Sequence, residues 1–386
     1  MGLFRGSIMN SLGTPLSEME VNMEKVNLTM PVKVLTILLI TSGLLFSAAL
    51  STEAQTGKAY VSSQDGTKIF VFDLSKNSLS KTINVFTPTP LGKALPPNIN
   101  DVAVAEGKVF VSIPGPEIAA TGINEVRVFD PRSDVLLGTI KTDMTPSGLL
   151  EYGGNIYVVN RYGYTIQVID PKTLKITRTI PFTVPKSTPM NNPLFMEIAN
   201  DKIYLPFPGG LSRPGGVQVI DLKTGKPTKF IEFNAISSYG PVAIKRISND
   251  KIYLGGSHSV AVLDTGTDEI TKEVPLSSKD VYAQSIAVYK NRAYVANSVS
   301  TVDVIDTGND TVLKEIDIGY HSYAFHLRTD VAAAMDKVFV SDAGRGLKII
   351  DTRTEKLITT ITTDEPLGPV AIASDGPDSS KQSEQQ

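Results

Sequence analysis

Aspartate recurs at one fixed place in a pattern that repeats along the chain. An apolar run ends on an aspartate seven times, as in VRVFD and VDVID, and a turn sequence follows each one. Such an aspartate accepts hydrogen bonds from backbone N–H groups two residues further along, which stabilises the turn. A catalytic carboxylate or a metal ligand would be needed once or a few times, not in every repeat. We therefore assign a structural turn role to Asp73, Asp130, Asp170, Asp221, Asp264, Asp306 and Asp351.

The residues that usually bind metals or act as nucleophiles show no converging arrangement. The chain has no cysteine, which excludes disulfides, thiolate metal sites and cysteine nucleophiles. His258 lies in GGSHSV, whereas His321 and His326 have a spacing that places them on opposite faces of any extended strand. No G-x-S-x-G sequence is present. The sequence thus predicts no catalytic residue, no metal and no cofactor.

Tyrosine and arginine occur in several of the segments that connect the apolar runs, as in NRYGYT. These two residue types are the ones most favoured at binding hot spots. If the connections meet on one face of the fold, their side chains form a ligand-binding surface. The candidates are Arg161, Tyr162, Tyr164, Arg213, Tyr239, Tyr282, Tyr320, His321, Tyr323 and Arg345.

Two short patterns define a repeat. A polar residue followed by apolar, aromatic and apolar residues, as in KIYLGG and RAYVAN, occurs seven times, and the apolar run ending on aspartate follows each copy. Alternating runs such as KITRTI and apolar stretches such as GPVAIKR complete the unit, so each repeat contains four strands. Four-stranded units of about 40–45 residues are typical of β-propellers. We predict an all-β, seven-bladed propeller over residues 58–376.

The end of the chain offers a strand that the first repeat lacks. The first repeat starts directly with KAYVSS, without the apolar stretch that opens the others. The segment Leu367–Gly376, LGPVAIASDG, matches that stretch and belongs to no other repeat. We predict that Val370–Ala373 pairs with Ala59–Val61, which completes blade one, closes the ring and leaves no open edge at the seam. We expect the polar residues 377–386 to be disordered.

Arg292–Gly319, RAYVANSVSTVDVIDTGNDTVLKEIDIG, resembles the repeat of the YVTN family of β-propellers. The shared features are the Tyr-Val-Ala-Asn core, the Val-x-Val-Ile-Asp run and the Thr-Gly that follows it. The resemblance covers about 320 residues and is weaker in the first, second and fourth repeats. It implies a propeller fold and an exported location, in a surface layer or in the bacterial periplasm. It implies no single activity, because one fold supports many functions.

The propeller fold determines where the connections lie. Connections between the second and third strands of a blade share one rim with the connections between blades. Long connections are expected at 86–100, 112–125 and 206–216. Insertions gathered on one face often form a binding surface, so we expect the Tyr, Arg and His candidates on this rim.

The N-terminal part has the pattern of a targeting segment. Val34–Leu50 is apolar and uncharged, with Lys33 before it and small residues after it, as in a secretory signal peptide. Its length is also at the short limit of a membrane span, so residues 30–54 are a signal peptide or a membrane anchor. Residues 1–29 are a leader or an over-extended reading frame. Both alternatives place the propeller outside the cytoplasm, secreted, at the cell surface or in the periplasm.

Charge and composition narrow the function. The formal net charge is −3, which disfavours nucleic-acid binding, although NRYGYT supplies a small part of a single-strand groove. We predict a non-enzymatic binding or scaffold propeller whose rim contacts a protein, peptide or glycan at the cell envelope. It would meet a membrane only through an N-terminal anchor. The alternative is a propeller enzyme, a lactonase-like hydrolase or an oxidoreductase, with a site at the channel mouth. Its candidate residues are Glu151, Glu197, Lys245 and Arg328.

Overall fold

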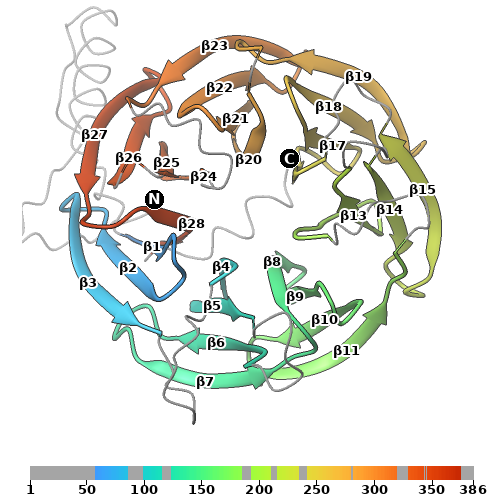
Figure 1. The fold of residues 1–386 in the computed structure, drawn as a ribbon, viewed down its shortest axis with the longest axis horizontal. Coiled ribbons are helices and arrows are strands. Elements are labelled where there is room, and N and C mark those ends of the chain that lie inside the picture. The colour runs from blue at the N-terminus through green and yellow to red at the C-terminus, as the bar shows by residue number, and fades with distance from the viewer. Residues whose placement is uncertain are drawn as a thin grey trace, which may run out of the picture. The chain divides into compact units, whose positions relative to one another are not determined.

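Consecutive strands of each repeat pair antiparallel, since short turns join them. The computed structural model describes residues 57–85, 99–114, 123–184, 193–209, 215–233, 241–279, 281–319, 329–342, 344 and 346–374. Within them, seven four-stranded sheets are arranged in a ring around a central axis (Figure 1). The prediction of an all-β, seven-bladed propeller is therefore confirmed.

The four strands of each blade follow one another from the axis outward. Blade one contains β28 (Leu367–Ser374), β1 (Gly57–Ser63), β2 (Lys68–Asp73) and β3 (Ser78–Asn84). Blade two contains β4 (Asp101–Ala105), β5 (Lys108–Ile113), β6 (Glu125–Phe129) and β7 (Leu136–Lys141). Blade three contains β8 (Pro146–Tyr152), β9 (Asn155–Asn160), β10 (Thr165–Asp170) and β11 (Lys175–Pro181). Blade four contains β12 (Glu197–Ala199), β13 (Lys202–Phe207), β14 (Gly215–Asp221) and β15 (Pro227–Phe233).

The remaining three blades have the same order. Blade five contains β16 (Ala243–Arg246), β17 (Lys251–Gly255), β18 (Ser259–Asp264) and β19 (Glu269–Pro275). Blade six contains β20 (Ala283–Tyr289), β21 (Arg292–Asn297), β22 (Thr301–Asp306) and β23 (Thr311–Asp317). Blade seven contains β24 (Asp330–Ala334), β25 (Lys337–Asp342), β26 (Gly346–Asp351) and β27 (Lys356–Thr362). We call the edge with the first-to-second and third-to-fourth strand turns the lower rim, and the opposite edge the upper rim.

The last strand of the chain completes the first blade, as predicted. β28 pairs antiparallel with β1, with Ala59 opposite Ile372 and Val61 opposite Val370. In Figure 1 the red β28 lies beside the blue β1, next to the axis. The seam of the ring is therefore a hydrogen-bonded ladder inside one sheet.

Hydrophobic packing between blades holds the ring together. Second and third strands are buried on both faces, so each contributes side chains to both neighbouring blades. The buried residues form seven clusters, and each cluster joins two adjacent blades. Since apolar burial contributes about 25 cal/mol per Å², these interfaces are the main source of stability.

The segments predicted to precede and follow the propeller fall outside the described residues. This applies to the leader 1–29, to the signal peptide or anchor 30–54, and to the tail 377–386. The chain divides into two units, Met1–Glu53 and Ala54–Gln386, and the propeller belongs to the second. Within the part of the chain that the structure describes, no helix is long and apolar enough to cross a membrane.

The predicted turn aspartates hold tight turns at the lower rim. Asp264, for example, accepts hydrogen bonds from Gly266 N at 2.9 Å and from Thr267 N at 2.8 Å. Each of the seven aspartates has a pKa below the ordinary value, because hydrogen bonds to the carboxylate favour the charged form. In Asp73 the main cause is the hydrogen bond from the Lys76 side chain. In every one of these turns, the residue four positions after the aspartate has a positive φ, between 48° and 72°.

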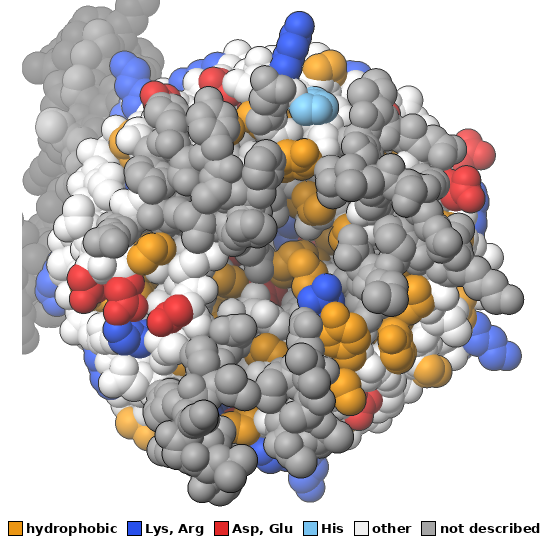
Figure 2. All heavy atoms as spheres, viewed as in Figure 1, with side chains coloured by type: hydrophobic (Ala, Val, Ile, Leu, Met, Phe, Trp, Pro, Cys, Tyr) orange, Lys and Arg blue, Asp and Glu red, His pale blue; other side chains and the backbone are white. Residues whose placement is uncertain are grey.

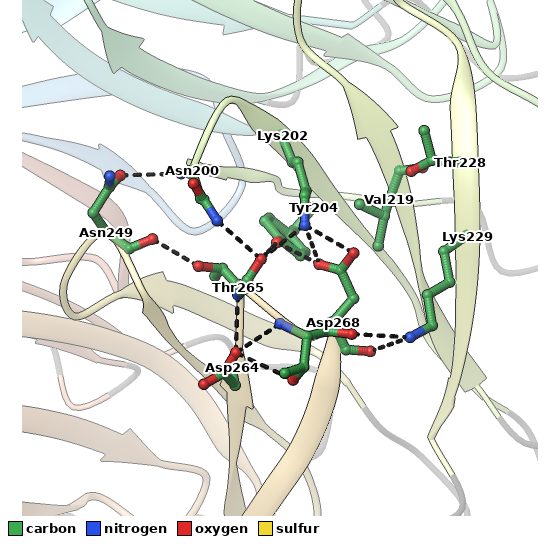
Figure 3. A network of polar contacts seen from close by, with 12 residues as sticks. Asn200, Lys202, Tyr204, Val219, Thr228, Lys229, Asn249, Asp264, Thr265 and Asp268 are labelled. Carbon is green, nitrogen blue, oxygen red and sulfur yellow. Dashed lines mark hydrogen bonds and ion pairs between the residues drawn. The ribbon is translucent and has the colours of Figure 1, made fainter.

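Acidic residues at this positive-φ position connect neighbouring blades (Figure 3). Asp268 accepts hydrogen bonds from Lys202 Nζ at 2.9 Å and from Tyr204 Oη at 2.7 Å, both on the second strand of blade four. The carbonyl of Thr265 accepts from the same two groups, at 2.8 Å and 3.2 Å. Burial, followed by the hydrogen bond to Asp268, raises the pKa of Tyr204. We call this contact between a second-strand Lys and Tyr and the acid of the next blade the interblade clamp.

The clamp recurs at two further interfaces, whereas the hydroxyl of Tyr294 has no hydrogen-bond partner among the described residues, although Glu355 occupies the turn position of the next blade. Tyr60 Oη donates to Asp134 at 2.8 Å, and Tyr253 Oη donates to Asp310. Both second strands with phenylalanine correspond to turns without an acid, whereas four of the five with tyrosine correspond to turns with one; the exception is Tyr157, which corresponds to Gly225. Phe110 corresponds to Leu174, and Phe339 corresponds to Asn77.

Candidate functional site

The two kinds of connection meet at the upper rim, as the propeller topology predicts. The turn between β9 and β10 contacts the connection between blades two and three, where Arg161 N donates to Thr145 O at 2.8 Å. Similarly, Ser298 N in the turn of blade six donates to Tyr282 O, in the connection from blade five, at 3.0 Å. The described candidates Arg161, Tyr162, Tyr164 and Tyr282 all lie at this rim.

Arginine and tyrosine form an exposed group in the blade-three turn. The guanidinium of Arg161 lies over the ring of Tyr162, 5.2 Å from its centroid. Tyr164 is 44% exposed, and its ring packs edge-on against Phe182 with centroids 6.1 Å apart. Phe182 in turn packs edge-on against the buried Phe207 at 6.2 Å. The exposed tyrosine is thus supported by a row of aromatic rings that leads into the core between blades three and four.

Tyr164 occupies a backbone position that suits glycine. Its φ is 55°, and the corresponding residues in the upper-rim turns of blades five and six, His258 and Ser300, have φ of 63° and 59°. The carbonyl of Tyr164 accepts a hydrogen bond from Phe182 N at 2.9 Å, which ties the turn to the end of the outer strand. A bulky residue in the left-handed region costs free energy, and such positions cluster at functional sites.

His258 and Tyr282 form a second aromatic group at the upper rim. Their ring centroids are 6.4 Å apart, and His258 N donates to Val281 O at 2.9 Å. The Nδ1 atom of His258 is buried and has no hydrogen-bond partner among the described residues. The sequence predicts Tyr282 as a rim residue but not His258, because a single histidine in GGSHSV carries no signal of its neighbour.

Six further candidates cannot be placed. Arg213, Tyr239, Tyr320, His321, Tyr323 and Arg345 lie outside the described residues. Their position at the rim stays a prediction from the strand order.

Buried polar side chains on the third strands fix the upper connections. Each stands at the centre of the apolar run that ends on the turn aspartate. This role is not predicted from the sequence, although a polar residue inside an apolar run is a detectable signal. Each side chain bonds the backbone just beyond the outer strand of the preceding blade: Gln167 with Asp143 N at 3.0 Å, Gln218 with Thr183 O at 3.0 Å, and Asp303 with Ser277 N at 3.3 Å.

The contribution of Asp303 to the stability of the folded protein depends on pH. Burial raises its pKa above the ordinary 3.8, although hydrogen bonds from Ser277 and Asn297 act in the opposite direction. The folded protein therefore holds this proton more tightly than the unfolded chain. The resulting stability is present below the unfolded-state pKa and is lost as the pH rises through the folded-state pKa.

We expect Asp303→Asn to gain stability relative to the parent protein as the pH rises from about 4 to about 7, by an amount on the order of 1 kcal/mol. The amide removes the buried charge, and the unpartnered Oδ1 of Asn297 can accept its N–H. Urea unfolding of both proteins across this pH range measures the difference. A difference that does not change with pH would contradict the assignment.

Two of the residues named for the enzyme alternative meet near the axis. Lys245 Nζ lies 2.9 Å from Glu197 Oε1, and the Glu197 side chain is 6% exposed. Glu151 accepts a hydrogen bond from Gly154 N in its own turn at 3.1 Å, and Arg328 lies outside the described residues. Within the described ranges, no group of three or more His, Asp or Glu side chains could hold a metal ion. On the face shown in Figure 2, hydrophobic side chains gather around the central hollow, with a few basic side chains among them.

Comparison with known proteins supports the fold. Searches with family models find no match, and no curated protein sequence matches either. Two structures of AztD from Citrobacter koseri, one of them the apo form, are similar, with TM-scores of 0.51 and 0.50 and 13% identity. They cover 84% and 83% of this chain, and 99% and 98% of their own. The computationally designed Ika8 protein has a TM-score of 0.54 at 14% identity, covering 82% of this chain and 90% of its own. At such low identity these similarities show the propeller fold alone.

Proposed function

We propose that this chain is an exported, non-enzymatic binding or scaffold propeller that presents its upper rim to a protein, peptide or glycan at the cell envelope. The observation that carries this proposal is the exposed Tyr164, held in a left-handed conformation beside the Arg161–Tyr162 stack. Tyr and Arg supply large contact areas together with hydrogen-bond donors, which is why they dominate binding hot spots.

Contacts elsewhere in the ring favour binding because they restrict the motion of the upper rim. At the lower rim, the interblade clamp joins Lys202 and Tyr204 to Asp268. At the upper rim, Gln167 bonds the backbone of the connection that contacts the blade-three turn. Side chains that are already ordered lose less conformational entropy when a ligand binds.

The N-terminal pattern supports the exported location. A basic residue, the apolar run Val34–Leu50 and the small residues after it are the features of a secretory signal or anchor.

The test is capture of a ligand from an envelope extract by the immobilised protein. We expect Tyr164→Ala to weaken capture about 30-fold, since truncation of a hot-spot residue costs about 2 kcal/mol. Protease and glycosidase treatment of the extract separates protein or peptide ligands from glycans. Arg132→Ala is the matched control, because Arg132 is an exposed arginine in a turn of the lower rim. Equal capture by the parent, Tyr164→Ala and Arg132→Ala proteins would refute the proposed rim.

A further inference from the structure

Two tyrosines hold the same place in their blades, at the lower end of the innermost strand, and each has a cation on its ring. In blade six, Lys290 Nζ lies 5.0 Å from the centroid of the Tyr289 ring. In blade three, the guanidinium of Arg246 lies 5.3 Å from the centroid of the Tyr152 ring. Tyr152 and Tyr289 are equivalent, since each pairs with the first residue of the second strand.

The blade-six pair holds a carboxylate. Lys290 Nζ lies 2.6 Å from Asp336 Oδ1, and Tyr289 Oη donates to the same oxygen at 3.0 Å. The hydrogen bond from Lys290, followed by that from Tyr289, lowers the pKa of Asp336. A tyrosine hydroxyl and a cation in this arrangement therefore form a receptor for one oxyanion.

The blade-three pair also combines a tyrosine and a cation, but it is not bonded to a described carboxylate. Asp201 occupies in blade four the turn position that Asp336 occupies in blade seven, with a φ of 57°, and makes no hydrogen bond or ion pair with Tyr152 or Arg246. Arg246 contacts the Tyr152 ring, but neither its N–H groups nor the Tyr152 hydroxyl has a hydrogen-bond partner in the described part of the chain. Both residues are half-buried. A guanidinium has five donors and no acceptor, so it needs acceptors from elsewhere.

No ion pair joins Arg246 to a carboxylate of the described residues, and Asp201 in the blade-four turn is exposed. Arg246 reaches from blade five to blade three past β12, which has three residues. The carboxylate of Glu197, on β12, is already paired with Lys245 at 2.9 Å. Consecutive residues of a strand face opposite sides, so Glu151 points away from the Tyr152 side of β8.

The acid that clamps the second-strand tyrosine is also missing from this part of the described chain. Tyr157 packs edge-on against Tyr152 with ring centroids 6.4 Å apart. The turn position that carries Asp134, Asp268 or Asp310 in other blades is Gly225 in blade four. Arg178 lies beside Gly225, where its guanidinium donates to the carbonyls of Leu222 and Lys223. The described part of this interface thus has two phenols and two guanidiniums, and the guanidinium of Arg246 is the one that contacts Tyr152.

We propose that Arg246 and Tyr152 form an oxyanion-binding site at the lower mouth of the channel, between blades three and five. The ligand group is a carboxylate or a phosphate. Arg246 supplies a planar fork of donors, which matches two oxygens of either group. Tyr152 holds the guanidinium through its ring and donates its hydroxyl, as Tyr289 does to Asp336.

The test is calorimetric titration of the full chain with inorganic phosphate and, separately, with succinate, at constant ionic strength. We expect saturable binding of at least one probe. Arg246→Gln weakens it about tenfold or more, because a charge-assisted hydrogen bond contributes about 1.5–3 kcal/mol. Tyr152→Phe, which keeps the ring and removes the hydroxyl, weakens it by a smaller factor. Binding of phosphate alone or of succinate alone identifies which oxyanion the site takes.

Lys290→Gln is the matched control, because it removes the cation of the pair whose carboxylate is already present. We expect it to bind the probe as the parent does, and circular dichroism verifies that each variant is folded. The proposal is overturned if neither probe binds up to about 10 mM, a limit of weak affinity. It is equally overturned if Arg246→Gln binds as the parent does, or if Lys290→Gln loses binding to the same extent.

Discussion

A chain that ends at Pro366 does not form the propeller, whereas a chain that ends at Gly376 does. The first truncation removes β28, whose Leu367 and Val370 are buried in the cluster between blades seven and one. It also leaves β1 without its partner on the axis side. We expect a loss of more than about 5 kcal/mol, which is comparable to the whole stability of a domain.

Limited proteolysis and size-exclusion chromatography of the two truncated proteins measure this effect. The protein ending at Pro366 should be digested rapidly or should aggregate through the exposed edge of β1. The protein ending at Gly376 keeps β28 and serves as the control. A protease-resistant, monomeric protein without β28 would show that the ring does not depend on this seam.

Asp268→Leu lowers the free energy of unfolding by about 3 kcal/mol. Lys202 and Tyr204 lose the carboxylate and keep only the carbonyl of Thr265 as an acceptor. The site is largely closed to water, since the Lys202 and Asp268 side chains are 24% and 13% exposed. Adding Tyr204→Phe should recover about 1–2 kcal/mol, because the phenol no longer needs a partner. This pair reproduces Phe110 and Leu174 of the same chain, at the same two positions.

Urea unfolding of the single and double variants measures this coupling. Asp336→Leu is the matched control, because Asp336 also has a φ of 54° but its side chain is 62% exposed. We expect it to cost less than about 1 kcal/mol, as exposed ion pairs do. Additive losses in the double variant would mean that Tyr204 and Asp268 contribute independently.

The fold is predictable from the sequence because the same four-strand pattern occurs in each of the seven repeats. Each turn aspartate, such as Asp264, acts on backbone atoms within its own turn, so local sequence is sufficient to predict its role. The pairing of Ala59 with Ile372 is predictable for a related reason, since the missing strand and the surplus strand match each other.

The contacts between blades are not predictable in the same way. Asp268 lies four residues from Asp264, but its partners Lys202 and Tyr204 lie in another repeat. Finding them requires the distance between second strands and the next turn, which sequence does not contain. Phenylalanine on the second strand goes with a turn that has no acid, and tyrosine goes with an acid except at Tyr157, but this relation can be recognised only after the repeats are assigned to neighbouring blades.

The rim is predictable in part. Strand order places Arg161 and Tyr282 at one edge, because alternating strand directions put their connections there. The left-handed conformation of Tyr164 and the contact of His258 with Tyr282 depend on backbone geometry and on adjacent blades. The same holds for Arg246 and its stacking on Tyr152, since these residues come from blades that are not neighbours in the chain.

The pairing of Gly57 with Ser374 has a mechanical consequence. Both residues stand at the same end of the β1–β28 ladder. Tension applied between them would therefore break the hydrogen-bonded pairs of this ladder one after another, starting from that end. If the force instead acted between Gly57 and the body of the ring, all hydrogen bonds of the blade-one sheet would share the load. A partner fused to the C-terminus of a surface-tethered protein would therefore load the weakest direction of the seam.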